Sequence, residues 1–359
     1  MPEPLKNSYN KQYISRLTDS FLISVPSFDV DLFHKKIFDD DWEGRELKSR
    51  MDHIAKMIYE ILALDYVGVL QLIKPVCEKF GGYEAMFFPH IIELYGLDFW
   101  DESMIALEHM TQFSSSEFAV RPFIIHSPLK MMEQMLRWAT HENHHVRRLS
   151  SEGCRSRLPW AMALPEFKKD PSLILPILEA LKNDDSEYVR RSVANNINDI
   201  AKDKPELVKS LALQWLGDSK NTDWIIKHGC RTLLKKADPD VLAFFGYVSR
   251  PDVEVSDFLM VDDVIDIGEE INFSFLLSSK NSMLGMLRIE YAIDYVKSNG
   301  SHSRKIFKIS EGNIQSKSKS IRRRQSFKNM STRKHYSGRH VLAVIVNGEE
   351  VGNVSFRVR

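Results

Sequence analysis

Residues His141 to His145 read HENHH, which matches the H-E-x-x-H pattern of zinc proteases. In that pattern the two histidines lie one helical turn apart and bind Zn²⁺, while the glutamate acts as the general base. Both ligands must therefore project from one continuous helix. The pattern indicates a zinc site only if His141 and His145 share a helix, so the elements around them decide its meaning.

An internal repeat supplies those elements. The segments HHVRRLSSEGCR, EYVRRSVANNIN and DWIIKHGCRTLL align with Val146, Val189 and Ile225 in register, at offsets of 43 and 36 residues. Both offsets lie near the period of two-helix HEAT-type repeats. Apolar residues recur at helical spacing from about Leu47 to Tyr247. Because such repeats bury their apolar faces only by stacking, we expect an α-solenoid with a concave surface.

The same register predicts where the helices begin. Asn143, Ser186 and Thr222 each stand three residues before an aligned position, and all are favoured N-cap residues. A helix that starts after Asn143 leaves His141 and Glu142 in the preceding turn. No third ligand at a suitable spacing is evident in the sequence. We therefore expect neither a metal site nor a metalloprotease.

The helix face opposite Val146 is polar in all three copies. In the first copy it carries Arg148, Glu152 and Arg155, at spacing i, i+4, i+7. The matching positions of the other copies are Arg191, Asn195, Asn198, Lys227 and Arg231. One interpretation, which periodicity alone favours, is a solvated face with an Arg148–Glu152 surface pair contributing ~0.3 kcal/mol. The other is a cationic stripe that contacts phosphates.

Glu117 and Trp160 are further candidates, each with a structural alternative. Ser114 and Glu117 form S-x-x-E, the pattern of a helix capping box. Pro122 follows five residues later and breaks or kinks a helix, so a broken helix can instead hold Glu117 at an exposed tip. Trp160 directly follows Pro159. A tryptophan there is more often a core residue than a ligand contact, because tryptophan is usually largely buried.

The spacing of apolar residues changes after Arg250. Short runs with the period-two pattern of strands follow: EINFSFLL, LRIEYAIDYV, RKIFKIS, HVLAVIV and GNVSFRV. The dipeptides Asn299-Gly300 and Asn347-Gly348 are favoured in type I′ hairpin turns. We therefore predict a HEAT-like α-solenoid over residues 1–248 and an immunoglobulin-like β-sandwich over residues 249–359.

The charge of the chain is unevenly spread. The 359 residues have a formal net charge of zero, yet the segment from Ser301 to His340 holds twelve basic residues against one acid, giving +11. Its richest part, SKSKSIRRRQSFKNMSTRK, has little apolar pattern, which predicts a basic loop. The concentration of basic charge indicates a specific contact of Arg322, Arg323 and Arg324 with a polyanion. A mobile solvated loop and a weak patch for any polyanion are the alternatives.

The remaining bulk features fit a cytoplasmic protein. The cysteines Cys77, Cys154 and Cys230 are widely spaced and form no C-x-x-C pair, as in a reducing compartment. The N-terminal residues lack the apolar core of a signal peptide. No apolar run approaches the roughly 18 residues that a membrane span needs.

Several long motifs together resemble one enzyme family. SSEFAVRPF, HHVRRLSSEGCRSRLPWA, VRRSVANNINDIAKD and DWIIKHGCRTL resemble the AlkC branch of the AlkC/AlkD-like DNA glycosylases, which are bacterial HEAT-like-repeat enzymes of alkylation repair. IEYAIDYVKSNG and NMSTRKHYSGRHVLAVIVNG look like the immunoglobulin-like domain that part of this branch carries. The resemblance covers most of the helical half and extends into the C-terminal half.

The resemblance implies a function and a site. It implies excision of cationic N-alkylated bases, such as 3-methyladenine and 3-methylcytosine, from double-stranded DNA at the nucleoid, without base flipping. The active-site positions that it implies are Glu117, Glu152 and Trp160. We expect a monomer without cofactors. Cations around the site would hold phosphates without reading sequence, namely Arg148, Arg155, Arg157, Arg190, Arg191, Lys227, Arg231 and the three arginines of the basic segment.

A non-enzymatic scaffold is the alternative function. Repeat solenoids often bind DNA or an acidic protein, and a fold does not fix a function. The set of Glu117, Glu152 and Trp160 discriminates between the two, because a scaffold has no need for two carboxylates and an indole on a cationic surface.

Overall fold

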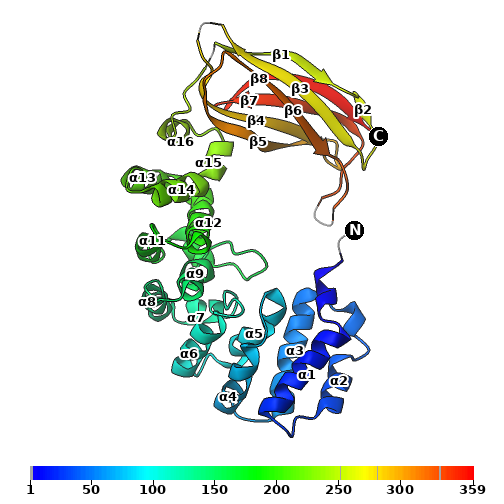
Figure 1. Cartoon of the computed structure of the whole chain (residues 1–359), viewed down its shortest axis with the longest axis vertical. Helices are drawn as coiled ribbons and strands as arrows, with labels where there is room; N and C mark the ends of the chain where they lie inside the picture. The colour runs from blue at the N-terminus through cyan, green and yellow to red at the C-terminus, as the bar shows by residue number, and fades with distance from the viewer. Residues whose placement is uncertain (1–2, 251, 281, 331–332) are drawn as a thin grey trace. The chain divides into compact units, whose positions relative to one another are not determined.

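The computed structural model describes residues 3–250, 252–280, 282–330 and 333–359, and in them helices precede strands (Figure 1). The last helix ends at Phe244 and the first strand begins at Val253, close to the point at which the apolar spacing in the sequence changes. The predicted fold class, a helical solenoid followed by an immunoglobulin-like β-sandwich, is confirmed. In the part of the chain that is described, no helix has both the length and the apolar character to cross a membrane.

Among the residues that the structure describes, three short 3₁₀ helices and a series of α-helices make up the helical half. The 3₁₀ helices are Leu5–Ser8, Trp42–Gly44 and Tyr83–Ala85. The α-helices are α1 (Lys11–Ser24), α2 (Val30–Ile37), α3 (Leu47–Leu62), α4 (Tyr66–Cys77), α5 (Phe87–Tyr95), α6 (Trp100–Met110), α7 (Arg121–His126), α8 (Pro128–Trp138), α9 (His144–Gly153), α10 (Pro165–Lys169), α11 (Leu175–Leu181), α12 (Glu187–Asp203), α13 (Pro205–Trp215), α14 (Lys220–Gly229), α15 (Arg231–Lys235) and α16 (Pro239–Phe244).

The repeat register predicted from the sequence holds in the helices. Val146 on α9, Val189 on α12 and Ile225 on α14 are all fully buried. Helix α12 packs between α9 and α14, while α8 and α11 pack against α9 and α12 (Figure 1). Stacking therefore buries one apolar face per repeat, as the pattern requires.

The predicted helix starts are right at two positions and wrong at one. Asn143 is the N-cap of α9 and accepts a 2.8 Å hydrogen bond from the amide of His145. Ser186 is the N-cap of α12. Thr222 is not a cap, because α14 begins at Lys220 and Thr222 is fully buried inside it. Ser219 takes the capping role instead, since its hydroxyl accepts from the amide of Thr222 at 3.1 Å.

By its internal contacts the chain divides into two compact units, residues 1–208 with 214–229 and residues 209–213 with 230–359. The second unit therefore includes α15 and α16 as well as the strands. Within it, Asn347 donates a 2.7 Å hydrogen bond to the carbonyl of Val248, and Gly348 lies against Ala237 and Leu242. The predicted boundary after residue 248 marks the change of secondary structure, whereas the division into units falls earlier.

Two sheets form the β-sandwich. The strands are β1 (Val253–Met260), β2 (Val264–Ile265), β3 (Glu270–Ser279), β4 (Gly285–Val296), β5 (His302–Ile314), β6 (Ser318–Ser326), β7 (Gly338–Val346) and β8 (Glu349–Val358). One sheet has the order β1-β3-β6 and the other β2-β8-β7-β4-β5. Alternate side chains of both sheets, among them Phe275, Leu287 and Leu342, fill the core between them.

The two Asn-Gly dipeptides behave differently. Asn347 and Gly348 both have positive φ, 49° and 87°, and join β7 to β8 as a two-residue turn of the expected type. Between β4 and β5 the connection is five residues long, from 297 to 301, and of its Asn299-Gly300 pair only Gly300 has positive φ. The longer connection removes the need for a type I′ turn there.

The expectation of a basic loop is wrong for its central part. Residues Ser318–Ser326 form strand β6, which pairs along its whole length with β3. Ile321 faces the core opposite Phe275, while Arg322, Arg323 and Arg324 are exposed. Strand β6 lies at the edge of its sheet, and Ile321 is its buried apolar residue. Serines and arginines surround Ile321 in the sequence, so the period-two alternation of a strand is not visible there.

Candidate active site

Glu117 lies in the turn that precedes α7. Pro122 occupies the first turn of α7, where proline is well tolerated, so it starts this helix and does not break one. The capping box is absent: the hydroxyl of Ser114 donates to the carbonyl of Gly82, and Glu117 accepts a 2.8 Å hydrogen bond from Ser115. With its side chain 15% exposed, Glu117 is not at an exposed tip.

Glu152 lies in the last turn of α9 and is buried. Its side chain is 7% exposed, and Arg148 and Arg155 both lie beside it. The interpretation as a solvated face with a surface ion pair is therefore wrong. Arg155 also falls beyond the end of α9 at Gly153, because the chain leaves the helix at Cys154, so it does not continue the face of Arg148 and Glu152.

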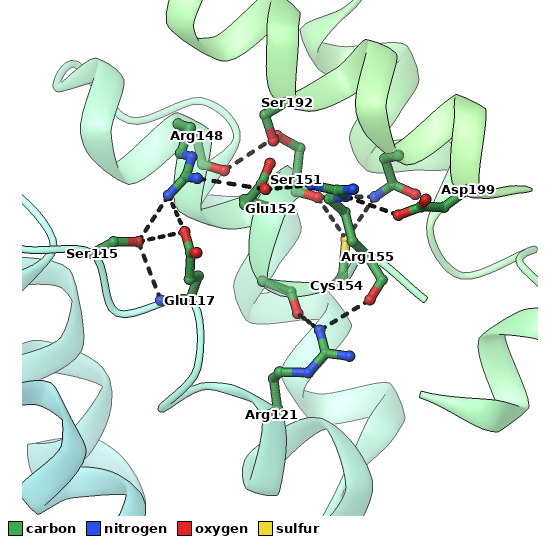
Figure 2. A network of polar contacts seen from close by, with 12 residues as sticks. Ser115, Glu117, Arg121, Arg148, Ser151, Glu152, Cys154, Arg155, Ser192 and Asp199 are labelled. Carbon is green, nitrogen blue, oxygen red and sulfur yellow. Dashed lines mark hydrogen bonds and ion pairs between the residues drawn. The ribbon is translucent and has the colours of Figure 1, made fainter. Parts of the chain in front are cut away.

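One guanidinium group links the two glutamates (Figure 2). Arg148 forms an ion pair with Glu117, and its Nη2 lies 3.5 Å from Oε1 of Glu152. Its Nη1 also donates to the hydroxyl of Ser115 at 2.8 Å. The structure thus brings together Glu117 and Glu152, 35 positions apart in the chain, around a single positive group.

A second arginine extends the network into α12. Nη1 of Arg155 lies 2.6 Å from Glu152, and its Nε donates to Asp199 at 2.9 Å. Lys202 contacts the other oxygen of Asp199 at 3.0 Å. Carboxylates and cations therefore alternate from Glu117 to Lys202, and the buried charges compensate one another.

The electrostatics keep both arginines charged. Burial opposes the charged form of Arg148, yet the negative charges of Glu117 and Glu152 outweigh it and raise the pKa of Arg148. Burial likewise opposes the charge of Arg155, and Glu152 and Asp199 raise its pKa in the same way. Two charged arginines thus lie between the acidic side chains of the site.

Trp160 is exposed, so its interpretation as a core residue is wrong. Its side chain lies on the segment that follows α9, the residue is 61% exposed, and its backbone has φ of 64°. A left-handed conformation is strained for a bulky residue and often marks a functional position. Lys48 of α3 holds the segment by donating a 2.8 Å hydrogen bond to the carbonyl of Trp160.

Arg121 completes the site, and the sequence did not reveal it. Its side chain is fully buried at the start of α7. The guanidinium donates to three backbone carbonyls that flank Trp160 in the chain, those of Gly153 at 2.8 Å, Arg155 at 2.9 Å and Met162 at 2.7 Å. Desolvation by burial lowers the pKa of Arg121 to about 10, so it stays charged at neutral pH.

The other predicted phosphate contacts lie apart from this network. Arg157 pairs with Asp203 at 2.6 Å and Arg191 with Glu187 at 2.5 Å, both on the surface. Arg190 donates to the backbone carbonyls of Asp184 and Asp185. Lys227 is on α14 and Arg231 starts α15, so the helix break at Cys230 separates two residues that we expected on one helix. The arginines Arg322, Arg323 and Arg324 lie on β6, in the second unit.

The H-E-x-x-H residues do not share a helix. Helix α9 begins at His144, which leaves His141 and Glu142 in the turn before it, as predicted. His141 accepts a 2.9 Å hydrogen bond from the amide of Asn143, and its Nε2 lies 3.6 Å from Glu108. Within the described ranges, no three His, Cys, Asp or Glu side chains are grouped as metal ligands would be.

Two family models match the chain. Residues 91–233 match the model described as DNA alkylation repair enzyme, which includes the whole charged network. Residues 254–359 match the model described as the C-terminal Ig-like domain of the uncharacterised protein YhaZ. The two matches follow the helical and β parts of the chain.

Two relatives match the chain over nearly its full length. The Bacillus subtilis (strain 168) protein YhaZ is 47% identical over 99% of this chain and 99% of its own. A solved structure, the Pseudomonas fluorescens alkylpurine DNA glycosylase AlkC bound to DNA containing an abasic site analog, is 37% identical. It covers 99% of this chain and 100% of its own, with a TM-score of 0.94. The likeness therefore spans both parts of the chain.

Proposed function

The chain belongs to the AlkC branch of the HEAT-repeat DNA glycosylases of alkylation repair, and from this premise we propose that it excises cationic N-alkylated bases from double-stranded DNA. The proposed substrates are 3-methyladenine and 3-methylcytosine. The observation that carries the proposal is that Glu117 and Glu152 converge on one positive group, the guanidinium of Arg148.

Two carboxylates that face one cation suit the cleavage of a glycosidic bond. As the bond breaks, positive charge develops on the deoxyribose, as in other glycoside cleavages. Glu117 and Glu152 would stabilise that charge and orient the attacking water. Their desolvated setting strengthens the interaction, since water screens it less.

The leaving base needs no general acid in this mechanism. An N3-alkylated base already carries a positive charge and leaves as a neutral molecule. This fits the chemistry of the site, where Glu117 and Glu152 are each paired with an arginine and are proposed to supply negative charge.

Trp160 is proposed to contact the lesion nucleotide. Its exposed indole, held in a strained backbone by Lys48 and by the bonds of Arg121 on either side, is available to a ligand. An aromatic face over a cationic base or sugar contributes ~0.5–2 kcal/mol. Because the indole is exposed on the protein surface, it can contact the nucleotide without a pocket into which the base would have to be flipped.

DNA is the proposed partner. The Pseudomonas fluorescens relative is bound to DNA, and the chain offers exposed and half-buried cations for phosphates. We propose Arg157, Arg190, Arg191, Lys227 and Arg231 as such contacts, with Arg322, Arg323 and Arg324 of β6 adding to them. Arg148 and Arg155 are engaged with carboxylates, so a phosphate role for them requires their release from these pairs.

Incubation of the protein with methylated duplex DNA, followed by chromatography of the released bases, tests the proposal. We expect release of 3-methyladenine and 3-methylcytosine at a rate proportional to the amount of protein. Binding of the duplex without release of any base would contradict it and would favour the scaffold function instead.

A further inference from the structure

The guanidinium of Arg148 is the charged group of the site that lies beside both Glu117 and Glu152. It pairs with Glu117 on one side and approaches Glu152 to 3.5 Å on the other, with its side chain 14% exposed. Within the described ranges, Arg148 is the one cationic side chain in an ion pair with Glu117. It is thus the resident counter-ion of both carboxylates to which the proposed function assigns the chemistry.

We propose that Arg148 occupies the place of the substrate's positive charge in the DNA-free protein, and that a cationic nucleotide must displace it. The inference rests on the proposed function. A guanidinium and an N-alkylated base are both planar groups with delocalised positive charge, so they compete for the same two carboxylates. Arg148 is therefore a specificity-determining residue as well as an ion-pair partner.

The two arginines of the network differ in how firmly they are held. Arg155 shares Glu152 with Arg148, but its Nε is also anchored to Asp199, and its side chain is 8% exposed. When Arg148 moves away, Glu152 keeps Arg155 as its partner. Within the described residues, the hydroxyl of Ser115 is then the remaining hydrogen-bond donor to the side chain of Glu117. Glu117 is therefore the carboxylate that displacement exposes.

In its resting position the guanidinium of Arg148 also contacts an aromatic ring. The Cζ atom of Arg148 is 5.0 Å from the ring centre of Tyr188, which stands at the start of α12 and is 43% exposed. The aromatic face retains the cation by its negative quadrupole. From that side Arg148 can meet a DNA phosphate, which would replace the lost carboxylates as its partner.

The exchange makes positive charge a condition for productive binding. A neutral nucleotide cannot compensate Glu117, and leaving this largely buried carboxylate without its counter-ion is strongly unfavourable. A cationic nucleotide replaces the charge that it displaces. A neutral duplex therefore binds with Arg148 still in place, and only a cationic nucleotide reaches the carboxylates.

The test compares two duplexes that differ in one charge. One carries a cationic pyrrolidine abasic analogue and the other its neutral tetrahydrofuran counterpart. The dissociation constants of both are measured for the full-length wild type and for Arg148→Gln, Arg148→Lys and Arg147→Gln. Arg147 is the matched control, because it lies on the same helix and forms a comparably buried ion pair with Asp184, away from both glutamates.

In the wild-type protein, the cationic duplex uses part of its binding free energy to displace Arg148. In Arg148→Gln there is no cation to displace, so we expect the preference for the cationic over the neutral duplex to rise at least tenfold. Arg148→Lys and Arg147→Gln should keep the wild-type preference. An unchanged or smaller preference in Arg148→Gln overturns the inference.

A measurement on the unaltered side chain covers the case in which Arg148→Gln does not fold. The Nε–H resonance of Arg148, assigned through Arg148→Lys, is followed by NMR in the free protein and in both complexes. We expect it to shift in the cationic complex and to keep its position in the neutral complex. Persistence in the cationic complex overturns the displacement. If bases are released normally but neither result appears, only this inference fails; without base release, the proposed function fails.

Discussion

The Nε atom of Arg155 donates a 2.9 Å hydrogen bond to Asp199, which lies 44 positions further along the chain and on the next repeat. Asp199 has only 2% of its side chain exposed. The bond fastens the end of α9, which carries Glu152, to α12. The alignment of repeats that buries Val146 and Val189 thus also fixes a buried ion pair beside the candidate catalytic carboxylate.

Loss of this bond should cost stability. We expect Asp199→Asn to lower the free energy of unfolding by about 3 kcal/mol, because it leaves the buried charge of Arg155 with one carboxylate fewer. The control is Asp203→Asn, whose partner Arg157 is 38% exposed, and there we expect at most about 1 kcal/mol. Urea unfolding followed by circular dichroism measures both. Equal losses in the two variants would contradict the account.

Trp160 should matter for excision and not for folding. Trp160→Gly removes an exposed side chain and relieves a left-handed conformation worth about 1–2 kcal/mol, so we expect equal or higher stability. We expect excision to fall by about two- to thirtyfold, as for a lost contact of ~0.5–2 kcal/mol. Trp138→Ala, at a residue 1% exposed, should instead destabilise by about 3–5 kcal/mol. Wild-type excision by Trp160→Gly would remove the residue from the site.

The H-E-x-x-H histidines should be dispensable. Because α9 starts at His144, His141 and His145 do not project from one helix. We expect the double variant His141→Ala, His145→Ala to excise bases at the wild-type rate, and EDTA to leave that rate unchanged. Stoichiometric zinc in the purified protein, lost together with activity on chelation, would show that the motif binds metal after all.

The arginines of β6 should set the salt dependence of DNA binding. Each phosphate contact contributes about 0.9 to the slope of log affinity against log salt concentration. We expect Arg322→Gln with Arg323→Gln to flatten this slope by nearly 2 and to weaken binding at low salt. Arg304→Gln is the control, because Arg304 is already paired with Asp294 and Glu350. DNA titrations across a salt series measure the slopes. Equal slopes for the β6 double variant and the wild type would mean that these arginines do not contact DNA phosphates.

The fold could be predicted where one face of an element is apolar. The repeat register followed from Val146, Val189 and Ile225, and five of the strands from runs such as HVLAVIV. Strand β6 was missed, because an edge strand with Ile321 as its buried residue carries no visible alternation. The choice of Ser219 over Thr222 as a cap was also hidden, since both residue types cap well and only the packing of Thr222 separates them.

The site could be predicted only in part. The residues Glu117, Glu152 and Trp160 came from the family resemblance, and the geometry of their surroundings did not follow from spacing. Periodicity placed Glu152 on the face opposite Val146 and hence in solvent, yet it is buried because α12 supplies Asp199 to its partner Arg155. Arg121 was also missed, because its partners are backbone carbonyls that no sequence pattern marks.

The central claim is that the charge of Glu117 and Glu152 drives base release. Single-turnover release of 3-methyladenine from methylated duplex DNA, with protein in excess, measures this step directly. We predict that Glu117→Gln and Glu152→Gln each lower the rate at least tenfold while DNA affinity is kept, because carboxylate charge stabilises the transition state more than the ground state. Glu142→Gln, in the exposed turn before α9, should release base at the wild-type rate. Wild-type rates in both Glu117→Gln and Glu152→Gln would contradict the account.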